Sequence, residues 1–224
     1  MNSYLPACIL FDLDGTLVDS LPGIELSVRE AFNTCRLPVP KQSLREMIGP
    51  PIRAILSRAG SVEEGGTLDA LERAFRTSYD GIGWQKAVCF PEAKRVLRLM
   101  HAGGHRLFVV SNKPRHVSLQ ILEREDILQY FEAVITRDSR SPNYCGKEEM
   151  VRAVLVERSI GWEHCLMVGD TTEDANAAAA AGIKFVWMTH GYGSASQMSS
   201  FPVAHSLESF SQFLPLITKE RICD

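Results

Sequence analysis

Short apolar runs recur along the chain, separated by segments with the residue spacing of amphipathic helices. Each run is apolar at consecutive positions, which is typical of parallel strands covered by helices on both faces. The runs are Cys8–Phe11, 106–110, Ala133–Thr136, 165–168 and Lys184–Met188, and the helical patterns between them are 92–101, 116–123, 147–159 and the alanine-rich 174–181. This alternation predicts an α/β fold with a doubly wound, Rossmann-like parallel sheet.

The alternation is interrupted once, directly after the first apolar run. Between Ser20 and Trp84 the sequence shows no strand pattern, but it has helical stretches at 23–34, 41–48, 52–59 and 68–79. We therefore expect a core made of residues 1–19 and 84–224, with an all-helical cap of residues 20–83 inserted into it. The turn-prone segments 19–22 and 81–83 would serve as hinges between the two.

Composition and net charge exclude only a few classes of protein. The 224 residues are 45% hydrophobic and 23% charged, the balance of an ordinary globular protein. A formal net charge of -3 argues against a general affinity for nucleic acid or an anionic membrane. The six cysteines include no C-x-x-C pair, and the N-terminus lacks a secretory pattern. We expect a cytoplasmic protein with reduced thiols, either a monomer or a homodimer.

Polar side chains follow three of the expected strands. In a parallel sheet the carboxyl ends of the strands share one edge, where ligands bind. Asp12 and Asp14 follow the first run, Ser111 and Asn112 follow 106–110, Asp170 and Asp174 follow 165–168, and Lys147 opens a helical pattern. These residues are therefore expected to converge.

Such a cluster favours phosphoryl-transfer chemistry. Neighbouring carboxylates repel one another unless a cation lies among them, and oxygen ligands suit Mg²⁺. One acid can attack phosphorus while the metal offsets the repulsion between two anions, and a second acid can transfer the proton. Ser111, Asn112 and Lys147 would supply donors and positive charge to the transferring group.

The sequence FDLDGT, together with Ser111-Asn112, Lys147 and GDTTED, resembles the four motifs of the haloacid dehalogenase-like hydrolase superfamily. The helical insert resembles that superfamily's C1 cap. The resemblance implies that Asp12 is the nucleophile and forms an aspartyl-phosphate, and that Asp14 is the general acid and base. It implies that Ser111 and Lys147 bind phosphate. It also implies a Mg²⁺ site formed by Asp12, the backbone carbonyl of Asp14, and Asp170, with Asp174 binding directly or through water.

Within the superfamily the chain is similar to phosphoglycolate phosphatases. Ser111-Asn112-Lys113-Pro114 is similar to their T-N-K-P, and His190-Gly191-Tyr192-Gly193 to their W-G-Y-G. The chain departs from them at Gly146-Lys147-Glu148-Glu149, which keeps the lysine but lacks the prolines of K-P-x-P. The resemblance implies a Mg²⁺-dependent phosphatase for a small phosphorylated metabolite.

Several alternatives remain open at the level of sequence. A β-phosphoglucomutase-type phosphoryl transferase or an inorganic pyrophosphatase would use the same acids, and a non-catalytic binding module is a third class. Asp174 could simply cap the alanine-rich helix. Lys113 competes with Lys147 for the phosphate-binding role, and Lys41, Arg45 and Arg53 are the cap residues that suggest substrate recognition.

Overall fold

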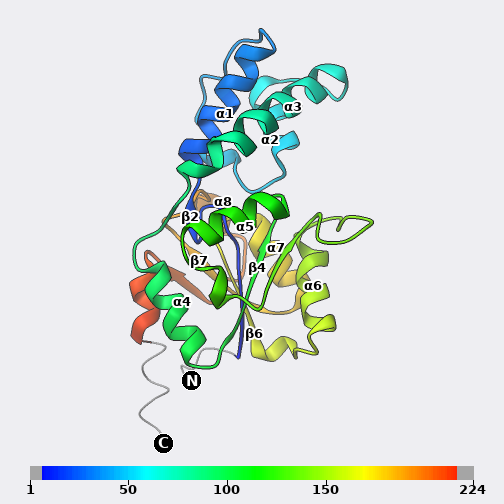
Figure 1. The fold of residues 1–224 in the computed structure, drawn as a ribbon. Helices are drawn as coiled ribbons and strands as arrows, with labels where there is room; N and C mark the ends of the chain where they lie inside the picture. The colour runs from blue at the N-terminus through cyan, green and yellow to red at the C-terminus, as the bar shows by residue number, and fades with distance from the viewer. Residues whose placement is uncertain (1–6, 216–224) are drawn as a thin grey trace, which may run out of the picture.

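The core of the protein is a six-stranded sheet in which all neighbouring strands are parallel (Figure 1). The computed structural model describes residues 7–215. The strand order is β5-β4-β1-β6-β7-β8, with β1 at Cys8–Phe11, β4 at Arg106–Ser111, β5 at Ala133–Thr136, β6 at Cys165–Gly169, β7 at Lys184–Met188 and β8 at His205–Leu207. The predicted doubly wound α/β fold is confirmed.

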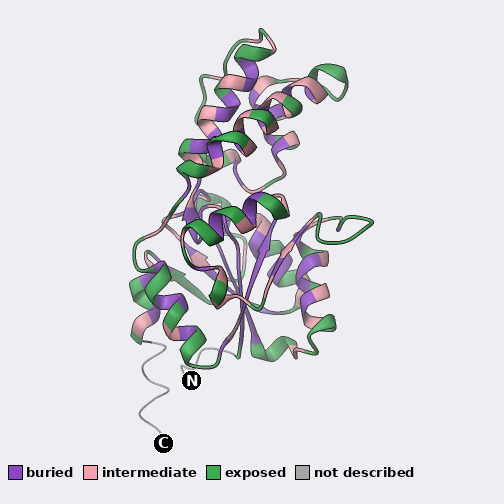
Figure 2. Ribbon diagram, in the orientation of Figure 1, coloured by how far each residue is buried: buried purple, intermediate pink, exposed green. Residues whose placement is uncertain are grey.

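Helices cover both faces of this sheet, which explains why its strands are apolar at consecutive positions. Ile9 and Phe11 of β1 belong to the apolar cluster beneath α4 (Ala93–Ala102) and α5 (Arg115–Arg124). Cys8 and Leu10 belong to the opposite cluster, beneath α6 (Lys147–Glu157), α7 (Thr172–Ala181) and α8 (Ala195–Met198). In Figure 2 the central strands β1, β4 and β6 are buried, whereas the helices have exposed outer sides.

The inserted cap lies beyond the carboxyl end of the sheet (Figure 1). It contains α1 (Leu21–Thr34), α2 (Ile52–Gly60) and α3 (Gly66–Gly81). The helix expected at 41–48 is wrong, because only a 3₁₀ turn at Arg45–Met47 forms there. Ser43 Oγ accepts a hydrogen bond from the backbone N–H of Arg45, a local turn that competes with a helix. The Gly49-Pro50-Pro51 sequence then prevents the helix from continuing.

A short antiparallel ribbon joins the cap to the core. It pairs β2 (Val18–Asp19) with β3 (Val88–Cys89), neither of which has a sequence pattern long enough to predict. Tyr192, from the loop after β7, fixes the start of α1. Its hydroxyl accepts hydrogen bonds from the backbone N–H groups of Ser20 (2.8 Å) and Leu21 (3.0 Å). The same hydroxyl donates to Asp19 Oδ1 (3.0 Å).

The cysteines of the described region carry no disulfide: Cys8, Cys35, Cys89, Cys145 and Cys165 are free. Cys223 lies outside the described residues. Cys8 and Cys165 are paired residues on neighbouring strands, with 3.3 Å between their sulfur atoms. Within residues 7–215, no helix combines the length and apolar character needed to cross a membrane.

Removing the Tyr192 hydroxyl should weaken the junction between cap and core. In Tyr192→Phe the buried N–H of Ser20 loses its acceptor, whereas the N–H of Leu21 keeps Asp19 Oδ1 at 3.2 Å, so the free energy of unfolding should fall by about 1–3 kcal/mol. Urea unfolding followed by circular dichroism would measure the change. Tyr144→Phe is the matched control, because the Tyr144 hydroxyl makes no hydrogen bond within the described part of the chain. Equal losses in both variants would contradict the assigned role of Tyr192.

Candidate active site

Three aspartates meet at the carboxyl edge of the sheet. Asp12 follows β1, Asp170 follows β6, and Asp174 lies in the first turn of α7. Each offers a carboxylate oxygen within 4.8 Å of the other two, and all three residues are buried. Their grouping follows from the pairing of β1 with β6, which aligns Phe11 with Val168 just before the acids.

Lys147 is the cation of this acidic cluster. Its Nζ lies 2.8 Å from Asp12 Oδ1 and 2.6 Å from Asp174 Oδ1. Burial lowers the pKa of Lys147, but the charges of Asp12 and Asp174 outweigh burial, so the pKa of the ammonium lies above its ordinary value. Lys147 therefore stays charged and partly neutralises the three acids.

With all three acids ionised, negative charge would exceed positive charge in the cluster. Burial raises the pKa of Asp12 well above its ordinary value, although Lys147 opposes the shift. Burial and the charge of Asp174 raise the pKa of Asp170 to about 7. Three ionised carboxylates against one ammonium would leave two negative charges in a region shielded from water, which favours a bound cation.

Asp170 is positioned by the chain around it. Its Oδ1 accepts from Thr16 Oγ1 (2.9 Å) and its Oδ2 from the Tyr192 backbone N–H (2.7 Å). The indole of Trp187 donates to its backbone carbonyl at 3.1 Å. Gly191 lets the chain approach closely, since a Cβ at that position would overlap Asp170.

Asp174 caps the alanine-rich helix, which the sequence analysis gave as an alternative to metal binding. Its Oδ2 accepts from the backbone N–H groups of Asp170 (3.2 Å) and Thr171 (2.9 Å), and from Thr171 Oγ1 (2.8 Å). The bond from the Thr171 N–H, together with the bond from the Asp174 backbone N–H to the Thr171 side chain, forms a capping box. Because Asp174 Oδ1 simultaneously contacts Lys147, the capping role and a place in the acidic cluster are compatible.

The three-aspartate cluster fits a divalent metal ion. Its donors are carboxylate oxygens, the ligands preferred by hard cations, and ligands on opposite sides of Mg²⁺ lie roughly 4 Å apart. Asp12 Oδ2 makes no hydrogen bond to the described residues and so keeps its lone pairs available. The cluster could therefore hold such an ion.

Asp14 lies apart from the other three acids. Its carboxylate accepts hydrogen bonds from Lys113 Nζ at 2.8 and 3.0 Å. Lys113 Nζ also lies 4.6 Å from the ring centroid of Tyr79 in the cap. The Asp14 carboxylate is thus engaged by Lys113. Any contact of Asp14 with a metal in the three-aspartate cluster would come from its backbone.

The loop after β4 brings the other expected residues to the same edge. Ser111 Oγ accepts a hydrogen bond from the backbone N–H of Lys113 at 3.3 Å. Asn112 Nδ2 donates to the carbonyl of Gly49 in the cap (3.0 Å) and to Glu173 Oε2 in the core (2.8 Å). Asn112 is therefore a bridge between cap and core as well as a neighbour of the acids.

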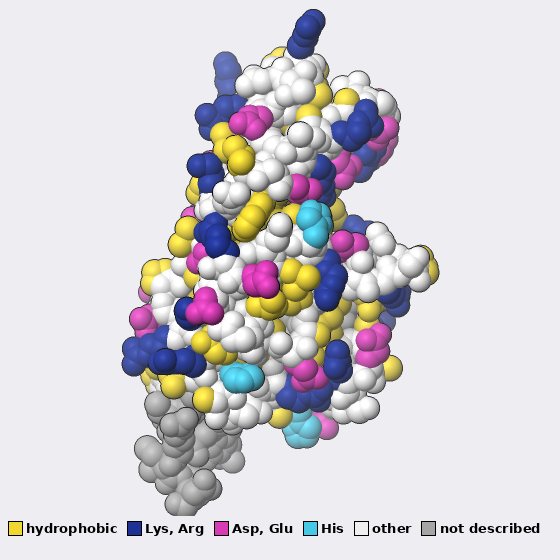
Figure 3. Space-filling model, viewed as in Figure 1, with side chains coloured by type: hydrophobic (Ala, Val, Ile, Leu, Met, Phe, Trp, Pro, Cys, Tyr) yellow, Lys and Arg dark blue, Asp and Glu magenta, His cyan; other side chains and the backbone are white. Residues whose placement is uncertain are grey.

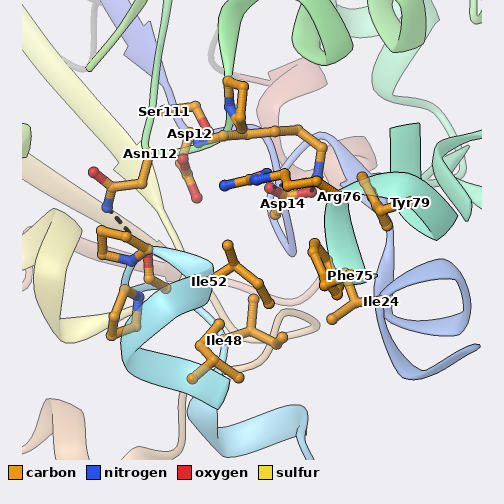
Figure 4. A pocket seen from close by; sticks show the side chains of 16 residues that line it. Asp12, Asp14, Ile24, Ile48, Ile52, Phe75, Arg76, Tyr79, Ser111 and Asn112 are labelled. Carbon is orange, nitrogen blue, oxygen red and sulfur yellow. Dashed lines mark hydrogen bonds and ion pairs between the residues drawn. The ribbon is translucent and has the colours of Figure 1, made fainter. Parts of the chain in front are cut away.

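A pocket opens between these residues and the cap (Figure 4). It encloses about 540 Å³, its open mouth included. Its core side consists of Asp12, Asp14, Ser111, Asn112, Lys113 and Pro114, and its cap side of Ile24, Ile48, Gly49, Pro50, Pro51, Ile52, Ile55, Phe75, Arg76 and Tyr79. The two aspartates thus share a concave surface with apolar side chains of the cap.

The cap residues singled out from the sequence do not line this pocket. Arg45 donates to the backbone carbonyls of His190 and Gly191, and Arg53 forms ion pairs with Glu64, Asp69 and Glu72. The cation that does line it is Arg76, which sequence reasoning missed. Its place three residues before Tyr79 puts both side chains on one face of α3, but the sequence alone does not show that this face meets the core.

Comparison with known proteins decides the family. Residues 9–188 match the family model described as haloacid dehalogenase-like hydrolase. The chain belongs to this family. The expectation drawn from FDLDGT, Lys147 and GDTTED is confirmed, and so is the resemblance to phosphoglycolate phosphatases.

Relatives of this family carry more than one activity in their names. The chain is 34% identical over 191 residues to the tyrosine-protein kinase PtkA of Mycobacterium tuberculosis, covering 85% of this chain but only 64% of PtkA. It is 32% identical to the phosphoglycolate phosphatase of Salmonella typhimurium, covering 93% of this chain and 91% of that protein. A predicted phosphoglycolate phosphatase from Haemophilus somnus superposes with a TM-score of 0.83 at 25% identity, covering 96% of this chain and 99% of that one.

Adding one methyl group at Gly191 should disturb the site. In Gly191→Ala the new Cβ would force Asp170 or its loop to move, which should lower the free energy of unfolding by about 1–3 kcal/mol. Chemical denaturation would measure the loss. Gly66→Ala is the control. Gly66 is the first residue of α3, and a Cβ added there would meet no atom within 4 Å. Full stability in Gly191→Ala would show that the loop accommodates the methyl group.

Proposed function

We propose that the chain is a Mg²⁺-dependent phosphatase that hydrolyses a small phosphate monoester through an aspartyl-phosphate on Asp12. One observation carries the proposal: among the described residues, Asp12 is the carboxylate that both belongs to the three-aspartate cluster and lines the pocket. A group in that position can contact a bound metal and a substrate at once. The family and the similarity to phosphoglycolate phosphatases support this assignment.

Asp12, Asp170 and Asp174, with the backbone carbonyl of Asp14, are the groups that would hold Mg²⁺. When bound there, the ion would neutralise the charge between the Asp12 carboxylate and the substrate phosphate. The size of Mg²⁺ and its preference for oxygen ligands suit a site built from carboxylates.

Side chains of the protein would carry out the nucleophilic attack and the proton transfers. Lys147 holds the Asp12 carboxylate in place. One oxygen of this carboxylate would attack phosphorus as the bond to the alcohol oxygen breaks, and the other would be available to the metal. Asp14, held by Lys113, would give a proton to the departing alcohol. It would then take a proton from the water that attacks the aspartyl-phosphate, releasing inorganic phosphate and regenerating both acids.

Ser111, Asn112 and Lys147 would bind the oxygens of the transferring group. The backbone of the loop after β4 and the buried ammonium are fixed before the substrate arrives, so little reorganisation accompanies the reaction. The helical cap of residues 20–83 would close over the site and exclude bulk water.

Transfer to an acceptor other than water is the second candidate. The similarity to the tyrosine-protein kinase PtkA favours it, and a phosphoglucomutase-like transfer to a sugar would use the same acids. Phosphate release in water, without an added acceptor, separates hydrolysis from both. An inorganic pyrophosphatase would release phosphate from pyrophosphate and leave monoesters intact.

Replacing the nucleophile should abolish turnover without unfolding the protein. Asp12→Asn keeps the shape of the side chain but removes the attacking carboxylate, so phosphate release from monoesters should fall by at least about 10³-fold. Asp126→Asn is the matched control, because Asp126 is exposed and pairs with Lys94 on the surface. Near-native turnover in Asp12→Asn would falsify the assignment.

Metal removal should affect both activity and stability. Chelation should abolish phosphate release, and Mg²⁺ should restore it. In the absence of substrate, Mg²⁺ should raise the melting temperature of the wild-type protein, because it offsets repulsion among the three acids. Asp170→Asn should lose most of this stabilisation in a thermal-shift assay. Full activity after exhaustive chelation, or an unchanged Mg²⁺ response in Asp170→Asn, would rule out the metal site.

A further inference from the structure

We infer that the substrate is a phosphate monoester of an uncharged, apolar alcohol, and that Arg76 binds its phosphoryl group from the cap side. The inference rests on the proposed phosphatase reaction and adds the class of substrate. It follows from the different chemistry of the two sides of the pocket.

The cap side of the pocket is an apolar wall. It brings together Ile24 of α1, Ile52 and Ile55 of α2, and Phe75 of α3, with Ile48 completing the surface. Each of these side chains is at most 9% exposed. An alkyl or aryl group gains affinity as it leaves water against these five side chains, whereas a carboxylate would lose its water there without meeting a charge. Besides Arg76, the polar side chain on the cap side is Tyr79, whose hydroxyl has no hydrogen-bond partner among the described residues.

The lysines near the pocket are already committed to carboxylates. Lys113 contacts both oxygens of Asp14, and Lys147 contacts Asp12 and Asp174. Lys147 would share its charge between these acids and the phosphate, so a dianionic phosphate entering between Asp12 and Asp14 gains from a further cation beside Lys147 and the metal.

Arg76 has its hydrogen-bonding capacity available. Its nearest charged neighbour is Glu72, at 3.8 Å, and its guanidinium makes no hydrogen bond to the part of the chain that the structure describes. Figure 4 shows its side chain extending from α3 into the pocket, on the side where Asp12 and Asp14 lie. A guanidinium in this position can give two parallel hydrogen bonds to phosphate oxygens.

The same geometry argues against a second anionic group on the substrate. If Arg76 binds the phosphoryl group, the rest of the substrate faces the isoleucines and Phe75, which offer no charge. Phosphoglycolate would place its carboxylate against this wall. We therefore expect the chain to prefer apolar esters despite its similarity to phosphoglycolate phosphatases.

A series of straight-chain alkyl phosphates tests the apolar wall. Ethyl, butyl and hexyl phosphate have leaving groups of nearly equal reactivity, so differences in kcat/KM report binding of the chain. With Mg²⁺ present, kcat/KM should rise by up to about fourfold for each added methylene. Phosphoglycolate should react more slowly than butyl phosphate. A flat series, or phosphoglycolate as the best substrate, would overturn the inference while leaving the phosphatase assignment intact. Failure to hydrolyse any monoester would overturn the proposed function itself.

Variants of the wall and of Arg76 separate the two parts of the inference. Ile52→Thr should reduce the ratio of hexyl to ethyl phosphate turnover, a ratio that does not depend on the folded fraction. Arg76→Ala should lower kcat/KM by roughly 10- to 100-fold for every ester, including phosphoglycolate. Arg76→Lys should recover part of the loss. Arg73→Ala is the control, because Arg73 is exposed on the same helix and does not line the pocket. A loss confined to phosphoglycolate would show instead that Arg76 binds a distal carboxylate.

Discussion

The burial of three carboxylates against a single ammonium is the constraint on which this structure depends. Asp12, Asp170 and Asp174 are shielded from water, and only Lys147 among the described residues lies within ion-pair distance of them. Such an arrangement persists only when the surrounding chain supplies hydrogen bonds and compensating charge. The hydroxyls of Thr16 and Thr171 and the backbone N–H groups around GDTTED supply the hydrogen bonds. The site therefore depends on the fold for its charge balance, and the remaining imbalance favours a metal.

The groups that stabilise this cluster also determine how the cap is attached. Tyr192 holds Asp170 with its backbone N–H and the start of α1 with its hydroxyl. Arg45 of the cap donates to the carbonyls of the two residues just before Tyr192. Figure 3 shows charged side chains spread over both parts of the visible face, with no single basic surface. Recognition is consequently better sought in the pocket between cap and core than on this outer face.

Much of the architecture could be predicted because β1, β4 and β6 are apolar on both faces, a pattern that periodicity detects. The convergence of the acids followed from the rule that parallel strands end at one edge. β8 was missed because His205-Ser206-Leu207 is a short edge strand with two exposed residues. The helix expected at 41–48 failed because local turn chemistry and two prolines outweighed its spacing. Arg76 and Tyr192 could not be assigned roles from sequence, since their partners are set by how the cap lies on the core.

The hydrogen bonds of Asn112 link movement of the cap to the loop after β4. Its amide spans the Gly49 carbonyl of the cap and Glu173 of the core, and it stands next to Ser111 on the loop expected to hold phosphate. An outward swing of the cap must break the bond to Gly49, and that break occurs at the loop itself rather than at a remote hinge. Opening the entrance and loosening the grip on inorganic phosphate would then be one event, so departure of the product need not await a separate rearrangement of the loop.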